Sequence, residues 1–225
     1  MSPPDRESRM WTERVRERAV RALPPEKLLP DRQPAYVSSW IYVFGVATIA
    51  ALIVVVVSGM ILGLKGPAWW HSSGIGHFVN SLHLWSTEIF FAVMVVHLWG
   101  KFFMGAWRGG RGLTWASGAV VFLIGIGAAF TGYLSQQNFD SQWIASEGKD
   151  GLNSVGIGAF FNVLNPGQML MWHIVLLPIV VGVVVVLHVI LVRRHGVVPP
   201  IGTETAGAET ATTVATGPDD EETLS

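Results

Sequence analysis

Four long apolar stretches divide the chain, and polar segments separate them. The first covers residues 40–64 and contains no charged side chain. The other three lie at about residues 79–104, 114–135 and 169–194. A transmembrane helix needs about 20 apolar residues to cross a hydrocarbon core of about 30 Å, so each stretch is long enough for one span. The pattern predicts an all-α fold, an integral membrane four-helix bundle.

The composition agrees with this prediction. Half of the 225 residues are hydrophobic and 14% are charged, whereas a soluble domain has about 25% charged residues. The formal net charge of -1 also gives no reason to expect nucleic acid binding, which requires a basic surface. We therefore expect membrane lipid, and no nucleic acid, around this protein.

The basic residues are distributed unevenly among the connecting segments. Of the fifteen, eight precede the first stretch, three lie from the end of the second to the start of the third, and two lie at the end of the fourth. Only Lys65 and Lys149 lie in the other two connections. Because basic loops remain in the cytoplasm, we expect a multi-pass protein of the cytoplasmic membrane with both termini in the cytoplasm. The charged start of the chain predicts no cleavable signal peptide.

The segments outside the spans differ in character. Residues 10–30 mix arginine, glutamate and apolar side chains, which predicts an interfacial amphipathic helix within a cytoplasmic N-terminal segment 1–35. Residues 202–225 are rich in threonine, alanine and acidic residues without apolar periodicity, which predicts a disordered cytoplasmic tail. The transmembrane domain is therefore expected to cover residues 36–201.

Two of the apolar stretches each carry a pair of histidines. His83 and His97 are 14 residues apart, and His173 and His188 are 15 apart. Such a step returns a helical side chain to within ~40–60° of its starting direction and advances the axis by ~21–23 Å. Each helix therefore presents two imidazoles on roughly one face, at two depths. Two such helices can hold two stacked flat metal cofactors, and the chemistry indicated is bis-histidine haem.

The chain has no cysteine, which excludes disulfides, thiolate metal sites and covalent haem attachment. Any haem is therefore a non-covalent b-type haem with histidine axial ligands. Since the second and fourth spans run inward, His83 and His173 form the outer pair, and His97 and His188 form the inner pair. The remaining histidines are expected at the membrane interface: His71, His77 and His195.

Glycines on the other two spans have a matching spacing. Gly45 and Gly59 lie 14 residues apart on the first span, and so do Gly118 and Gly132 on the third. Small residues allow a bulky group to approach a helix backbone closely. Because these spans run outward, Gly45 and Gly118 are expected at the depth of the inner histidines, and Gly59 and Gly132 at that of the outer ones, facing the cofactor edges. Ordinary small-residue helix packing is the alternative.

On these residues the chain resembles the cytochrome b subunit of quinol–cytochrome c oxidoreductases (bc complexes) and of their split, chloroplast-type relatives. That family has paired histidines on its second and fourth helices and paired glycines on its first and third. The resemblance extends over residues 36–201 and includes LHLWS, RGLTWASG, TGY and LHVILVRRHG. The 15-residue histidine spacing resembles the split type.

The resemblance implies a function in electron transfer. Quinol is oxidised near the outer face, one electron passes to a Rieske iron–sulfur protein and the other passes through the outer haem to the inner haem, where quinone is reduced. It also implies cytochrome c as a partner and a dimeric complex. The family's Pro-Glu-Trp-Tyr segment has no counterpart here. A separate chain like subunit IV is therefore expected to supply the C-terminal half, and this chain is not expected to be catalytic alone.

Several positions depart from the family pattern. Asn80 and Gln168 stand where the family often has arginine, and the segment from Ser135 to Asn138 replaces a Leu-Pro-Trp-acid sequence. All lie near the expected outer haem, so a different outer electron partner is an alternative. The same scaffold would then be a quinone-linked relay or membrane anchor of another redox enzyme. Val43 stands where the split family has the cysteine for an additional covalent haem.

Glu88 is an acidic residue within the second apolar stretch. It lies about 140° around a helix from His83, so we expect it to point away from the haems. A carboxyl at this depth is either a proton relay or ion partner, or a hydrogen-bonded group facing another helix or subunit. A non-redox transporter or structural membrane subunit, whose histidines handle protons, is the remaining alternative, although it gives no reason for the matched spacings.

Overall fold

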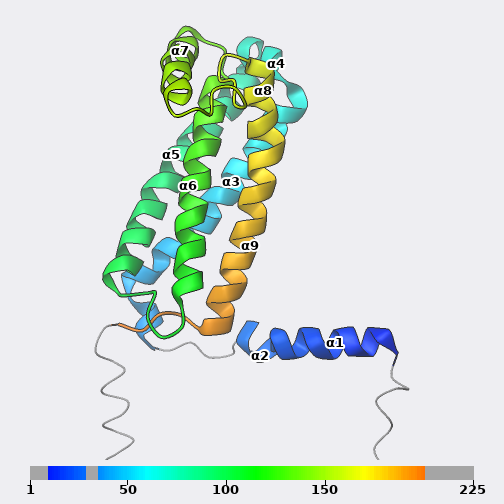
Figure 1. Cartoon of the computed structure of the whole chain (residues 1–225), viewed down its shortest axis with the longest axis vertical. Coiled ribbons are helices and arrows are strands. Elements are labelled where there is room, and N and C mark those ends of the chain that lie inside the picture. Colours follow the sequence, from blue (N-terminus) through cyan, green and yellow to red (C-terminus); the bar gives the residue numbers. More distant parts are fainter. Residues whose placement is uncertain (1–9, 29–34, 201–225) are drawn as a thin grey trace, which may run out of the picture.

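The computed structural model describes residues 10–28 and 35–200, and within this part of the chain all regular structure is helical. Four helical segments are long and apolar enough to cross a membrane, and Figure 1 shows them side by side in one bundle. They are α3 (Val43–Lys65), α5 (Gly74–Phe103), α6 (Gly112–Leu134) and the continuous segment Pro166–His195. The predicted all-α four-helix membrane fold is confirmed.

The last span is made of three consecutive pieces. It begins as α8 (Pro166–Met171), continues through the π-helical turn η4 (Trp172–Leu176) and ends as α9 (Leu177–His195). The change of helix type has a local cause, because Pro178 has no backbone N–H to donate to the carbonyl of Ile174 and its ring would clash with that carbonyl. A π-turn widens the helix at this point and accommodates the proline.

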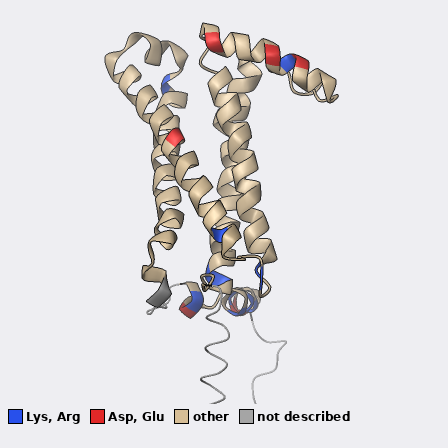
Figure 2. Ribbon diagram, turned by 90° about the vertical axis from the view of Figure 1, so that its left-hand side faces the viewer, with Lys and Arg blue, Asp and Glu red and all other residues tan. Residues whose placement is uncertain are grey.

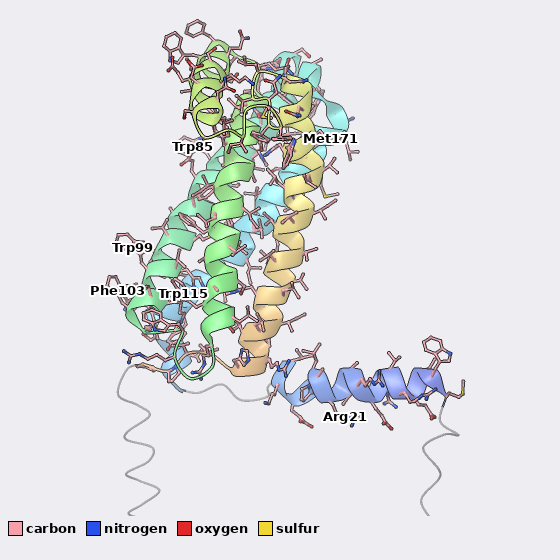
Figure 3. All side chains as sticks on the ribbon, in the orientation of Figure 1. Arg21, Trp85, Trp99, Phe103, Trp115 and Met171 are labelled. Carbon is pink, nitrogen blue, oxygen red and sulfur yellow. The ribbon has the colours of Figure 1, made fainter. Side chains whose placement is uncertain are left out.

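The bundle has a small buried centre and an apolar exterior. Ala51, Phe90, Met94 and Val121 form the buried cluster at mid-height. Most other apolar side chains on the spans are exposed in the isolated chain, as expected for helices whose outer surface contacts lipid or another subunit. Figure 3 shows Trp85, Trp99 and Phe103 projecting from the outer side of α5, where they are 64–69% exposed.

The second span starts earlier than predicted. The Ser73 hydroxyl accepts a hydrogen bond from the Gly76 backbone N–H at 3.3 Å and caps α5 at its N-terminus. His77 therefore lies inside α5 and not in the connection before it. His71 lies in the short helix α4 (Pro67–Ser72), and its carbonyl is 3.2 Å from Nε2 of His77.

The connection between the third and fourth spans contains a helix that the apolar pattern did not predict. Helix α7 (Phe139–Ser154) begins where the Asn138 side chain accepts a hydrogen bond from the Ser141 N–H at 2.8 Å. It packs on the end of the bundle through Leu134, Ala145, Val163 and Met169. This end also carries α4 and α8 (Figure 1).

The N-terminal segment forms a helix at the opposite end of the bundle. Helix α1 (Trp11–Ala22) has no buried residue, and Figure 1 shows that it lies roughly perpendicular to the spans, with the short α2 (Pro25–Leu28) between it and the bundle. In Figure 2 the charged residues gather at the two ends of the bundle and on α1. The predicted tail 202–225 lies outside the described residues.

Candidate functional site

The four paired histidines come together between the helices at two levels. At the outer level, the ring centroids of His83 on α5 and His173 on η4 are 6.0 Å apart, with an angle of 82° between the ring planes. At the inner level, His97 on α5 faces Gly45 on α3, and His188 on α9 faces Gly118 on α6. The other histidines lie away from these pairs, since His71 and His77 contact each other and Nδ1 of His195 is 2.9 Å from the hydroxyl of Thr114.

The π-turn explains why the two histidine spacings differ. A π-turn uses i→i+5 bonds and holds one more residue than an α-turn. The turn η4 contains His173 and precedes α9, which carries His188. The 15-residue step on the fourth span is therefore geometrically close to the 14-residue step on α5. Both helices present their two imidazoles in nearly the same register.

Three of the four imidazoles place Nδ1 against an oxygen atom of a neighbouring helix. The contacts are His83 with the Val55 carbonyl (3.0 Å) and the Ser58 hydroxyl (3.0 Å), His173 with the Ala128 carbonyl (2.8 Å), and His188 with the Ser117 hydroxyl (2.9 Å). A carbonyl oxygen only accepts, so Nδ1 carries the proton. The Nε2 atom of the same imidazole then keeps the lone pair that it needs to bind a metal.

The serine hydroxyls support the same proton assignment. Ser58 donates its hydroxyl proton to the Val54 carbonyl at 2.7 Å, and Ser117 donates to the Thr114 carbonyl at 2.8 Å. Each hydroxyl oxygen is then free to accept from an imidazole N–H. These serines were not among the residues predicted from the sequence, although each stands directly before one of the paired glycines. Among the described residues, Nδ1 of His97 is buried without a hydrogen-bond partner.

Each paired glycine faces one paired histidine. A Cβ built on Gly45, Gly59 or Gly118 would lie 3.0–3.1 Å from an imidazole Cε1, and one on Gly132 would overlap the ring, with Nδ1 at 2.8 Å. The matching histidines, in the same order, are His97, His83, His188 and His173. Real Cβ atoms rarely come so close to other atoms. The glycines therefore provide the room that the rings occupy, in addition to any clearance for a cofactor edge.

A cavity of about 440 Å³ lies beside the outer pair. It is bounded by α3, α5, α6 and the start of the fourth span, and its walls include Gly59, Gly132 and both outer histidines. Glu88 also borders it, although its side chain is exposed in the isolated chain. The cavity extends around α5 from His83 toward α6, and a residue 140° from one ligand still borders it.

The positions that depart from the expected pattern also lie here. Asn80, Ser135 and Gln136 line the cavity. The Gln168 side chain accepts a hydrogen bond from the Asn162 backbone N–H at 2.6 Å and so stabilises the loop before α8. Among the described residues, the cavity walls include no lysine or arginine.

The residues of the outer pair fit a metal held in a flat macrocycle. No group of three or more histidine, aspartate or glutamate side chains that could hold a metal ion occurs in the described residues, whereas protein sites for bare zinc use at least three side chains. Two opposed imidazoles leave the other coordination positions to the macrocycle. A centroid separation of 6.0 Å accommodates one metal ion, because metal–imidazole bonds are about 2 Å.

Comparisons with known proteins point in the same direction. The family described as Cytochrome b(N-terminal)/b6/petB matches residues 88–216. The chain is 32% identical to the cytochrome bc complex cytochrome b subunit of Chlorobaculum thiosulfatiphilum over 142 residues, which are 59% of this chain and 33% of that protein. It is 26% identical to cytochrome b6 of Heliobacterium mobile over 190 residues, 75% of this chain and 89% of that one.

Two further similarities cover more of the chain. The menaquinol:cytochrome c reductase cytochrome b subunit of Bacillus subtilis is 24% identical over 200 residues, which are 79% of this chain and 88% of that one. A solved structure described as a hyperthermophilic respiratory Complex III matches with a TM-score of 0.64 and 18% identity, over 90% of this chain and 63% of that chain. At this identity the structural match shows a shared fold.

Proposed function

Because this multi-pass membrane protein belongs to the cytochrome b N-terminal (cytochrome b6) family, we propose that it is the haem-carrying subunit of a quinol-oxidising, bc-type complex. The observation that carries this proposal is the arrangement of the histidines, with two on each of two facing helices at two levels. The names of the relatives support the assignment, since they include cytochrome b6 and menaquinol:cytochrome c reductase.

The four histidines are proposed to bind two non-covalent b haems. His83 and His173 would be the axial ligands of the outer haem, and His97 and His188 those of the inner haem. When bound, the haems supply reversible one-electron transfer between the two sides of the bilayer. The protein would orient each imidazole through its Nδ1 contact, where one exists. Gly45, Gly59, Gly118 and Gly132 would give the rings their room, and the apolar spans would exclude water.

We further propose an orientation with both termini at the cytoplasmic face of the cytoplasmic membrane, which the concentration of lysine and arginine at that end supports. Helix α1 would lie in the membrane interface, because it has arginines together with exposed Trp11, Val15 and Val20 and lies across the bundle axis. The partners would be a chain with the C-terminal half of cytochrome b, a Rieske protein, cytochrome c and quinone, in a dimeric complex.

A second candidate is the same scaffold in another redox enzyme, as a quinone-linked relay with a different outer electron partner. The observation that favours it is the character of the outer cavity, in which Asn80 and Gln136 line the wall while Gln168 is bound to a loop. Identification of the co-purifying subunits would distinguish the two candidates. A Rieske protein supports the first and a different redox subunit supports the second.

The haem content of the purified complex tests the proposed sites. We expect two low-spin b haems per copy of this chain, because the four histidines would form two pairs of axial ligands. A pyridine haemochrome assay against the amount of protein measures this ratio, and the spectrum distinguishes b haem from covalently attached haem. A ratio near zero or one would contradict the assignment.

The activity of the isolated chain tests the need for a partner. Expressed alone, the chain is expected to bind haem but to fail to reduce cytochrome c with quinol, because no second polypeptide completes the outer quinol site. The measurement is the rate of cytochrome c reduction, with co-expressed partner subunits as the positive control. Robust turnover by the chain alone would refute the proposed division of labour.

A further inference from the structure

Glu88 stands at a position where a carboxyl is energetically costly. It lies halfway along α5, 14 residues after Gly74 and 15 before Phe103. Figure 2 shows that most charged residues are at the ends of the bundle, whereas Glu88 lies midway along a helix that is long and apolar enough to cross a membrane. Ionisable groups at this depth are rare, and they mark sites where an opposite charge or a polar pathway compensates them.

Within the described residues, the wall of the outer cavity offers no fixed positive charge to Glu88. It lines the cavity beside the outer pair, and no lysine or arginine is among the other residues of that wall. Its neighbours one turn away on α5 that also line the cavity are the apolar Leu84 and Phe91, and the neutral Thr87 precedes it. The wall from α6 adds Tyr133 and Gln136, which are neutral hydrogen-bonding groups.

The outer haem that would occupy this cavity carries a positive charge, opposite to that of the Glu88 carboxylate, in its oxidised state only. With two neutral imidazoles, the iron and the dianionic macrocycle together carry one positive charge when ferric and none when ferrous. A bound metal is often the largest local charge in its site. A carboxylate at the cavity wall therefore stabilises the ferric state and lowers the reduction potential.

The position of Glu88 along α5 makes this effect specific for one level. It is five residues from His83 and nine from His97, which corresponds to ~7.5 Å and ~13.5 Å along the axis. The inner level has a charge of the opposite sign, since Lys101 follows His97 by one turn and its ammonium lies 3.8 Å from the centroid of the Tyr42 ring. The two levels therefore differ in their electrostatic surroundings.

We propose that Glu88 sets the potential of the outer haem: its carboxylate, on the wall of the outer cavity, holds that haem at a lower potential than it would otherwise have. This inference rests on the proposed function. Together with Lys101 at the inner level, the charge favours electron transfer from the outer haem to the inner one. A unit charge about 10 Å away, at an effective dielectric constant of about 20, changes an equilibrium constant by about tenfold.

The test is a redox titration of the purified complex, followed by the optical spectra of both haems. Glu88→Gln keeps the size of the side chain and removes its charge. We expect the outer ferrous-to-ferric ratio at a fixed potential to rise about tenfold, a shift of about +59 mV for a one-electron couple, with a smaller shift at the inner haem. Glu88→Asp keeps the charge and is expected to stay close to the unmodified protein.

A second variant adds charge to the same wall. Gln136→Glu introduces a carboxylate of nearly the same shape, and the outer potential is expected to fall relative to the inner one. If Glu88→Gln proves unstable, Gln136→Glu still tests whether a charge on this wall changes the outer potential. Two bound haems with an unchanged outer potential in these variants would overturn the inference, and so would equal shifts of both haems. Absence of haem from the unmodified complex would instead contradict the proposed function itself.

Discussion

Replacement of His97 by alanine is expected to leave a protein that binds one haem instead of two. The inner haem would keep only His188, and a single imidazole does not hold a six-coordinate low-spin iron. The outer pair lies ~21 Å away along the helix axis, so its haem should remain. Haem content and the low-spin optical spectrum of the purified complex measure the result. His83→Ala should have the reverse effect and remove the outer haem.

His77→Ala is the matched control for these substitutions. His77 is on the same helix α5, but its ring contacts the carbonyl of His71 and lies outside both pairs. The change of residue type is identical, so a general effect of losing an imidazole would appear in all three variants. We expect two haems in His77→Ala. Two haems in His97→Ala at normal protein levels would show that His97 is not a ligand.

The sequence alone predicted the four spans correctly because long apolar stretches have few alternatives in a membrane protein. It could not predict α7 (Phe139–Ser154), since this helix has mixed polarity and is held by the Asn138 cap and by contacts with the end of the bundle. The start of α5 was misplaced for a similar reason, because Ser73 caps the helix before its apolar residues begin.

The histidine pairs were visible in the sequence, but the contacts that orient them were not. Helical periodicity gives the direction of a side chain on its own helix, whereas the Nδ1 partners come from neighbouring helices, such as Val55 for His83 and Ala128 for His173. Periodicity also did not show that Glu88 borders the outer cavity, because an angle measured from one ligand does not show how far the cavity extends around α5. The π-turn at Trp172–Leu176 likewise needed the structure.

Gly132→Ala is expected to remove most of the outer haem with a single added methyl group. The new Cβ would overlap the His173 ring, with Nδ1 at 2.8 Å. The same Nδ1 is 2.8 Å from the Ala128 carbonyl, so the ring cannot move without losing the contact that orients it. Overpacking of this kind costs about 1–3 kcal/mol, which corresponds to roughly a five- to 150-fold loss in haem affinity.

The other glycines of α6 provide a graded set of controls for this prediction. A Cβ on Gly127 would have no neighbour within 4 Å, and one on Gly118 would lie 3.1 Å from Cε1 of His188. Gly127→Ala should therefore bind both haems, and Gly118→Ala should weaken only the inner one, and less severely. Redox-resolved spectra and the haem-to-protein ratio measure all three. A normal outer haem in Gly132→Ala would contradict this prediction. It would mean that His173 can bind the iron from a different position and does not need the space beside Gly132.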